Sequence, residues 1–396
     1  MKNPGKKNRI GLAIYANPDY YPPIINAVNI LAAEFDIIIL CRNQDSPNID
    51  YHSGVRLIRI GSIKTAREKE AQPGIVKLLE YLVFFLRTVI DFRLYHCRLI
   101  YIYDMHSLLP GFLASRLGRK VPIIYHNLEL TGLKEAKGMG YFLKCVELYL
   151  VRYVDKIIIP DINRARFFQK EASLPKLPDV VMNNPLRTTQ LPINILKGEL
   201  MARGFPSDTK VILYQGAIGQ AHSILEVVRS MTSWPEDTVF ALSGIVFSEF
   251  MIKLQQQVKA LGMARRVIYL PFLPYTQILS YTVGAFLGIA LFKSKEINQF
   301  FVAGASNKIF EYLAAGVPVI TNEAPHFRQV LDPSFAYFVR PDSVEDIAGA
   351  VNFAFNNPDD YRQKSRSARE AHLSRFNYQE QFKPVQEYIR RVIYAD

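Results

Sequence analysis

The sequence predicts an α/β protein built from two doubly wound, Rossmann-like domains that face each other across a cleft. Three observations support this prediction. The chain of 396 residues is long enough for two domains of ordinary size. Short apolar runs alternate with helical stretches, a pattern typical of parallel strands that helices cover on both faces. A proline-rich stretch with weak periodicity, 174–208, interrupts this rhythm near the middle of the chain.

The predicted elements follow one another in the same rhythm in both halves. In the first half, strands are predicted at 9–15, 36–41, 55–60, 99–103, 121–125, 156–159 and 180–182, with helices at 24–34, 74–92, 108–117 and 141–153. In the second half, strands are predicted at 210–214, 239–242, 267–270, 285–291 and 317–320, with helices at 344–356 and 378–394. We therefore place the first domain at 1–187, the second at 188–375, and a C-terminal helix, 376–396, that packs back towards the first domain.

The charge of the chain favours anionic partners, since the formal net charge is +12 and the pI is about 9.4. The stretch 74–92 contains Lys77, Glu80, Arg87 and Asp91, too many charges for a helix that spans a membrane. At helical spacing these four residues fall within about a quarter of the circumference. We interpret the stretch as a helix packed on the sheet, with a helix that lies on a membrane surface as the alternative.

The N-terminus and the cysteines bear on the compartment. The basic start, 1–7, is followed by a short apolar run and no small-residue cleavage site, so we expect no secretion signal. Cys41, Cys97 and Cys145 are odd in number and lack CxxC spacing, which favours buried thiols in a reducing compartment. We expect a cytoplasmic protein, with a location at the inner face of the cytoplasmic membrane as the alternative.

The stretch 305–320 is the most informative part of the sequence. Ser306 or Asn307 can cap a helix whose buried face includes Phe310, and Gly316 can take the left-handed position that ends it. A helix start presents free N–H groups and a positive dipole end, which together suit a phosphate, and Lys308 adds a full charge. Glu311, one turn later, can accept hydrogen bonds from the hydroxyls of a ribose. The spacing thus suits a nucleotide, although plain helix capping gives the same residue types.

This stretch resembles the donor-binding signature of family 4 glycosyltransferases, which are retaining enzymes of the GT-B fold. The resemblance implies that Glu311 holds the ribose hydroxyls, and that the backbone of Ser306 and Asn307, with Lys308, faces the diphosphate. One departure concerns the transferred sugar. Many members have a second glutamate eight residues earlier, in contact with the donor sugar, where this chain has Ala303.

The resemblance extends to other loops of the chain. It places Gly216 and Ala217, which follow a predicted strand, near the pyrophosphate, and the backbone of Leu273 at the base. In the first domain it places His126 against a hydroxyl of the donor sugar or the acceptor. Further polar residues at strand ends and in the first loop are expected on the acceptor side: Asp19, Tyr20, Asp104, His106 and Glu129. Leu128 replaces a second histidine of many members, and each of these residues also has a purely structural interpretation.

The expected function is transfer of a hexosyl group, with retention, from a nucleotide-sugar, which we expect to be a UDP-sugar, to a glycan or lipid-linked acceptor. We assign the catalytic roles to His126, Lys308 and Glu311, with no metal and no cofactor besides the donor substrate. The family implies a role in surface polysaccharide synthesis, with possible peripheral membrane contact. A nucleotide-sugar 2-epimerase and a non-catalytic nucleotide-sugar-binding protein remain as alternatives. A nucleic-acid partner is not expected, because basic and aromatic residues are not interleaved.

Overall fold

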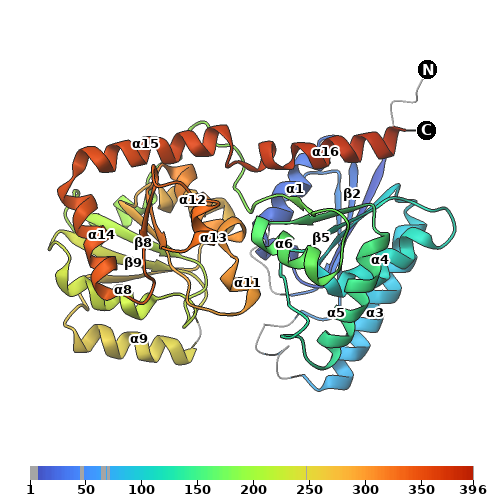
Figure 1. Cartoon of the computed structure of the whole chain (residues 1–396), viewed down its shortest axis with the longest axis horizontal. Helices are drawn as coiled ribbons and strands as arrows, with labels where there is room; N and C mark the ends of the chain where they lie inside the picture. Colours follow the sequence, from blue (N-terminus) through green and yellow to red (C-terminus); the bar gives the residue numbers. More distant parts are fainter. Residues whose placement is uncertain (1–7, 45–48, 64–67, 69–71, 247, 396) are drawn as a thin grey trace. The chain divides into compact units, whose positions relative to one another are not determined.

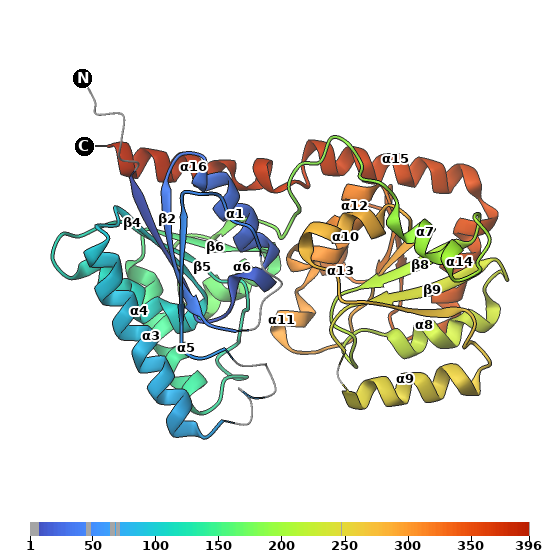
Figure 2. The same cartoon turned by 180° about the vertical axis from the view of Figure 1, so that it is seen from behind.

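The computed structural model describes residues 8–44, 49–63, 68, 72–246 and 248–395. Its contacts divide the chain into two compact units. Unit 1 comprises Met1–Met182 and Gln381–Asp396, and unit 2 comprises Asn183–Glu380. Each unit is a parallel sheet with helices on both faces (Figures 1 and 2).

Unit 1 contains a seven-stranded sheet in the order β3-β2-β1-β4-β5-β6-β7. Helices α3, α4, α5 and α6 cover one face of this sheet, where Lys144 of α5 pairs with Glu171 of α6, and α1 lies on the other face (Figures 1 and 2). The strands are β1 Arg9–Ile14, β2 Asp36–Arg42, β3 Val55–Ile60, β4 Leu99–Tyr103, β5 Ile123–His126, β6 Lys156–Ile159 and β7 Asp179–Val180. The helices are α1 Pro22–Ala32, α3 Gly74–Leu94, α4 Asp104–Arg116, α5 Gly138–Leu150, α6 Ile162–Glu171 and α16 Tyr378–Tyr394.

Unit 2 contains a six-stranded sheet in the order β10-β9-β8-β11-β12-β13. Its strands are β8 Lys210–Gln215, β9 Thr238–Ser243, β10 Val267–Leu270, β11 Leu287–Ala290, β12 Val319–Asn322 and β13 Ala336–Val339. Its helices are α7 Ile195–Ala202, α8 Ile224–Ser230, α9 Ser248–Ala260, α10 Tyr275–Thr282, α11 Ile297–Phe300, α12 Asn307–Ala315, α13 Pro325–Arg328, α14 Val344–Asn356 and α15 Pro358–Ser374. The two doubly wound sheets confirm the predicted fold class.

The strands form because they are continuously apolar and buried on both faces. Every residue of β4 and β5 in unit 1, and of β9, β11 and β12 in unit 2, is buried. Neighbouring strands pair in parallel register, for example Ile10 with Ile37 and Ile212 with Phe240. This burial is what the alternation of apolar runs and helices predicted.

The C-terminal helix α16 packs on unit 1, as predicted. Arg390 forms an ion pair with Glu34, which follows α1, and Gln386 Nε2 donates a hydrogen bond to the same carboxylate at 2.8 Å. The ammonium of Lys156, at the start of β6, lies 5.1 Å from the ring centroid of Tyr388. These contacts join the end of the chain to strands and helices formed near its beginning.

Three details differ from the predictions. Helix α4 begins at Asp104, directly after β4, and not at 108, because Asp104 adopts a positive φ of 57° that turns the chain without a loop. Strand β13 was not predicted, although it is as long as the predicted strands 156–159 and 267–270. Cys145 lies exposed on α5, whereas Cys41 and Cys97 are buried as expected.

Helix α3 packs on the sheet through one face, as predicted, but its opposite face is also apolar. Phe84, Thr88 and Phe92 are buried, while aliphatic side chains of the same helix are exposed. Among the described residues, no helix has the length and apolar character needed to cross a membrane.

Candidate active site

The carboxyl ends of β8 and β11 define the candidate site in unit 2. These two strands are neighbours in the sheet although they are not consecutive in the chain. The connections that leave them therefore diverge, and such a switch point opens a crevice that α/β proteins use to bind ligands. The glycine loop after β8 and the start of α12, which follows β11, both lie at this point (Figure 2).

Helix α12 begins with its amide groups uncapped by side chains. Ser306 occupies the N-cap position but its side chain makes no capping hydrogen bond, and Oδ1 of Asn307 is buried without a partner among the described residues. Gly316 ends the helix in the left-handed conformation, with a φ of 73°, as the sequence predicted. The helix start therefore has hydrogen-bonding capacity that the chain itself does not use.

Lys308 lies in the first turn of α12, and two aromatic rings enclose its ammonium group. Its Nζ atom is 4.8 Å from the ring centroid of Tyr214 and 4.8 Å from that of Phe292. Burial lowers the pKa of Lys308 to about 8, and the nearby Glu311 opposes this shift. A bound phosphate would add counter-charge to this partly buried cation.

Glu311 is buried one turn further along α12, with 6% of its surface exposed. Gln215, the last residue of β8, donates a hydrogen bond from Nε2 to Glu311 Oε2 at 2.5 Å. The amide of Gln215 is oriented in turn by Thr282, whose hydroxyl donates to Gln215 Oε1 at 3.0 Å. Burial raises the pKa of Glu311 to about 7, while the bond from Gln215 and the charge of Lys308 lower it in part.

Tyr312 anchors α12 to both strands at the switch point. Its hydroxyl donates to the carbonyl of Leu213 on β8 at 3.0 Å and lies 3.3 Å from the carbonyl of Ile289 on β11. It also accepts a hydrogen bond from the amide of Gln215 at 3.2 Å. Gly288 makes room for the ring, because a Cβ atom there would lie 2.3 Å from Tyr312 Cδ2. These contacts fix the position of Lys308 and Glu311 relative to the sheet.

The loops after β8 and β9 pack backbone against backbone. The amide of Gly216 donates to the carbonyl of Ser243 at 2.9 Å. Gly216 and Gly244 have φ values of 125° and 151°, which side chains rarely allow. A Cβ atom on Gly216 would lie 3.0 Å from Cε of Lys308, and one on Gly244 would lie 1.7 Å from the carbonyl oxygen of Gly216. Gly216 and Ala217 are exposed, although the carbonyl of Ala217 already accepts a hydrogen bond from the hydroxyl of Tyr214.

Other predicted residues of unit 2 are less exposed. Leu273 lies in the loop that follows β10 and is 7% exposed. Ala303, where many family members have glutamate, is 1% exposed in a short 3-10 turn. His222 follows the glycine loop and is neutral, since burial and the charge of Lys308 lower its pKa to about 3. Within the described residues, the lysine of α12 thus carries the positive charge beside this loop.

In unit 1 the structure does not present His126 to a ligand. The ring has no exposed surface, and its Nδ1 atom lies 3.0 Å from the hydroxyl of Tyr101. Burial lowers the pKa of His126 to about 3, so the ring is neutral. Tyr101 and Tyr103 pack against the ring, and its Nε2 atom is buried without a hydrogen-bond partner among the described residues, so the expected contact with a hydroxyl stays a prediction.

Asp19 is likewise a structural residue. Its Oδ2 atom pairs with Arg59 Nη2 at 2.8 Å, and its Oδ1 atom accepts from the hydroxyl of Tyr51 at 2.8 Å. With 3% of its surface exposed, Asp19 holds the first loop against β3 and does not face solvent. Tyr20, the next residue on this loop, is 36% exposed.

Asp104 joins the ends of β4 and β5. Its Oδ1 atom accepts hydrogen bonds from the amides of Leu128 at 2.7 Å and Glu129 at 3.0 Å. Burial raises the pKa of Asp104 to about 7, the charge of Glu129 adds to this, and the two amides oppose it. Glu129 is exposed beside it, and His106 stacks on Tyr15 with 5.9 Å between ring centroids. The structure thus brings Asp104 and Glu129 together at the predicted edge.

Several residues of the site escaped sequence reasoning. Tyr214, Gln215, Thr282 and Phe292 surround Lys308 and Glu311, but they come from three different elements. Gln215 carried the one available signal, since it is a polar residue at the end of an apolar strand. Among the described residues, no group of three or more histidine, cysteine or carboxylate side chains is placed to hold a metal ion.

The two parallel, doubly wound sheets and the helix that returns to the first of them define the GT-B class of glycosyltransferases. Solved structures of this fold resemble the whole chain. Sucrose-phosphate synthase from Thermosynechococcus elongatus has a TM-score of 0.75 and 16% identity, covering 98% of this chain and 100% of the other. Anabaena Alr3699/HepE in complex with UDP and glucose has a TM-score of 0.73 and 14% identity, covering 96% and 99%. A glycosyltransferase from Rickettsia africae has a TM-score of 0.74 and 11% identity, covering 98% and 100%.

The family is identified from the second unit. Residues 200–371, which include the glycine loop and all of α12, match the family described as Glycosyl transferases group 1. No curated protein matches the chain significantly. The second unit therefore carries the domain of this family, family 4, and the chain is a glycosyltransferase with the GT-B fold.

Proposed function

We propose that this glycosyltransferase takes a sugar from a UDP-sugar and transfers it, with retention of configuration, to a lipid-linked acceptor in surface polysaccharide synthesis. The pair of Lys308, which is partly buried, and Glu311, which is buried, beside Gly216 carries the proposal. This pair offers a cation next to uncapped helix amides and, one turn away, a carboxylate for a ribose. Complexes of Anabaena Alr3699/HepE with UDP-glucose and with UDP and glucose support the choice of base, since their fold is the same.

In the proposed mechanism, the main catalytic task is to stabilise the departing diphosphate. The β-phosphate would lie at the start of α12, against the backbone of Ser306 and Asn307. As the bond from the sugar to this phosphate breaks, negative charge grows on the phosphate oxygens, and Lys308 and the amides stabilise that charge. The acceptor hydroxyl would then attack the oxocarbenium-like sugar from the side of the leaving group and give its proton to an oxygen of the departing diphosphate. Gly216 and Ala217 would bring further backbone groups to the diphosphate.

The roles of the remaining predicted residues follow from their burial. Glu311 would accept hydrogen bonds from the ribose hydroxyls, and Leu273 would offer its backbone to the base. His126 and Asp19 would act as positioning residues, because neither side chain reaches solvent. Glu129, His106 and Tyr20 retain partial or full exposure and would lie on the acceptor side.

A cavity at the carboxyl edge of the first sheet supports a lipid-linked acceptor. It has a volume of about 210 Å³ and lies between the ends of β1 to β3 and helix α3. Its walls are mostly aliphatic and aromatic, and Arg42 and Glu80, which form an ion pair at 3.4 Å, are its charged residues. An apolar cavity with a few polar groups suits the first part of a lipid carrier better than a free sugar.

The test is a thermal-shift and turnover panel with the full-length protein. We expect UDP to raise the melting temperature more than GDP, ADP or TDP, and a UDP-sugar to be hydrolysed slowly without acceptor. Clearly greater stabilisation by GDP would overturn the choice of base. Conversion of the donor sugar to its C2 epimer without release of UDP would identify an epimerase. Binding without hydrolysis or transfer, across a panel of acceptors, would identify a non-catalytic protein.

A further inference from the structure

Helix α3 of unit 1 presents a continuous aliphatic face to solvent. Its exposed fractions range from 37% at Leu78 to 68% at Leu94. The residues recur at helical spacing along the whole helix: Ile75, Leu78, Leu79, Leu82, Val83, Leu86, Ile90 and Leu94. At about 1.5 Å per residue, the 21 residues of α3 give this face a length of about 30 Å.

The polarity of α3 is the reverse of that of an ordinary surface helix. Its acidic residues lie on or near the packed side, where Glu80 pairs with Arg42 at 3.4 Å and Asp91 pairs with Arg87 at 2.8 Å. Asp91 is 6% exposed, whereas Leu86 and Ile90, its neighbours along the helix, are 56% and 50% exposed. A soluble surface would place these charges outward, so the aliphatic face needs an explanation.

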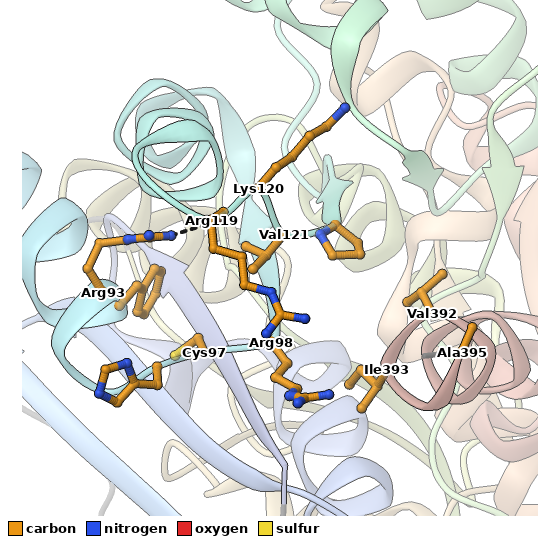
Figure 3. Close-up of a pocket in the computed structure, with 12 residues that line it drawn as sticks. Arg93, Cys97, Arg98, Arg119, Lys120, Val121, Val392, Ile393 and Ala395 are labelled. Carbon is orange, nitrogen blue, oxygen red and sulfur yellow. Dashed lines mark hydrogen bonds between the residues drawn. The ribbon is translucent and has the colours of Figure 1, made fainter.

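A basic pocket of about 430 Å³ lies at the C-terminal end of α3 (Figure 3). The side chains of Arg98 and Arg119 point into it, whereas Lys120 points away, and the end of α16 forms the opposite wall (Figure 3). Arg93, the residue before Leu94, also lines it and donates from Nη1 to the carbonyl of Arg119 at 2.8 Å. No carboxylate is found among the described residues that line the pocket.

We propose that unit 1 docks on an anionic lipid bilayer, with the aliphatic face of α3 in the interfacial region and phosphate-bearing lipid headgroups in the basic pocket. The two features meet at Arg93 and Leu94, which are consecutive in the chain. A helix that lies in the membrane interface buries its apolar face at the boundary of headgroups and acyl chains, and cationic groups beside it add attraction to anionic lipids.

A bilayer explains the composition of the face better than a protein partner. Cores of protein interfaces are enriched in tyrosine, tryptophan, phenylalanine and arginine, and leucine is under-represented among their energetic centres. The large apolar residues that α3 exposes are leucine, isoleucine and valine, and the charged residues that it exposes, Lys77 and Arg87, are basic. Arginine binds phosphate oxygens through paired N–H groups, which matches the headgroups of anionic lipids. This inference deepens the proposed function, because an acceptor held in a bilayer requires the enzyme to reach that surface.

The test is sedimentation of the full-length protein with vesicles, without donor or acceptor. We compare vesicles of phosphatidylcholine with vesicles that also contain phosphatidylglycerol, and we expect markedly stronger binding to the second. Leu82→Ser/Leu86→Ser should weaken binding at least about tenfold, since each exposed leucine would lose its burial in lipid. Arg98→Gln/Arg119→Gln should weaken binding to anionic vesicles by about fivefold per arginine.

Helix α9 of unit 2 supplies matched controls. Ile252 on this helix is 57% exposed, and Lys253 and Lys259 are also exposed. Ile252→Ser and Lys253→Gln/Lys259→Gln should bind vesicles as the unchanged protein does, and circular-dichroism melts should show all four variants folded. Equal binding to both kinds of vesicle, or folded α3 and pocket variants that bind like these controls, would overturn the inference. The thermal-shift panel tests the donor proposal without vesicles. If that proposal fails, the failure is therefore distinguishable from a failure of membrane docking.

Discussion

The Nε2 atom of Gln215 lies 2.5 Å from Oε2 of Glu311, so the last residue of a strand holds the carboxylate of a helix that follows nearly a hundred residues later. This contact fixes a buried carboxylate at the switch point of the second sheet. The same turn of α12 carries Lys308, whose charge is also buried. Two groups with shifted pKa values in opposite directions, placed one turn apart, are a feature of binding sites and not of ordinary helix starts.

Replacement of Lys308 tests the proposed stabilisation of the leaving group. We expect Lys308→Ala to lower kcat/KM by about a hundredfold to a thousandfold, in the range measured when one group that stabilises developing charge is removed. The matched control is Lys295→Ala, which removes an exposed lysine from the loop after β11 and should leave the rate unchanged. Equal rates for the two variants in a transfer assay would place the diphosphate elsewhere.

The affinity for UDP should be greatest between about pH 7 and pH 8. Below the pKa of about 7, Glu311 takes up a proton and is a poorer acceptor for the ribose hydroxyls. Above the pKa of about 8, Lys308 is neutral in the free protein and must regain its proton to pair with the diphosphate. The Kd should then rise by up to about tenfold per pH unit, since one unit is worth about 1.4 kcal/mol.

Calorimetric titration with UDP from pH 6 to pH 10 measures this profile. Lys308→Arg is the diagnostic variant, because arginine stays protonated throughout this range. In this variant the affinity for UDP should no longer fall above about pH 8, even if the affinity itself is lower. If the affinity for UDP falls equally above pH 8 in the unchanged protein and in Lys308→Arg, a group other than Lys308 titrates.

The role of Glu311 can be tested with the nucleotide itself. The unchanged protein should bind UDP more tightly than 2′,3′-dideoxy-UDP, which lacks the hydroxyls. In Glu311→Gln this preference should shrink by about tenfold, because hydrogen bonds to a charged acceptor are stronger by about 1 to 1.5 kcal/mol. Glu323→Gln is the control, since Glu323 is exposed and pairs with Arg328. If Glu311→Gln keeps the full preference, another group holds the ribose.

Asp104 makes a prediction about stability in unit 1. Asp104→Ala removes the acceptor of two amide groups and places alanine at a φ of 57°. The variant should lose about 2 to 4 kcal/mol of unfolding free energy from the unpaired amides and the backbone strain together. Asp104→Asn keeps an acceptor oxygen and tolerates this φ, so its melting temperature should stay near that of the unchanged protein. Similar melting temperatures for the two variants would show that the contacts contribute little.

The sequence was sufficient for the elements with strong local signals. The strands at 55–60, 99–103, 156–159 and 267–270 match the structure residue for residue, because each is a run rich in apolar residues between polar neighbours. Helix α12 was predictable because Gly316 supplies a residue that takes positive φ at its end. The start of α4 was not, because Asp104 takes a positive φ without being glycine.

The side-chain environment of the site was harder to predict than the position of the site. His126 and Asp19 were predicted to face a ligand because polar residues at strand ends and in loops often do so. Asp19 is instead held by Tyr51 and Arg59, whose sequence separations of 32 and 40 residues leave no local trace. Gln215 reaches Glu311 across 96 residues, so the pattern around either residue gives no indication of the other.

The contact between Gly244 and Gly216 has a consequence for the tolerance of the chain to mutation. Any side chain at 244 would meet the carbonyl of Gly216, although Gly244 belongs to a different loop. In a library that samples every amino acid at every position, 244 should therefore be depleted of substitutions as strongly as a catalytic residue. Depletion at position 244 would reflect the close approach of two backbone segments. Because this effect acts on folding, an assay that measures only protein abundance would detect it.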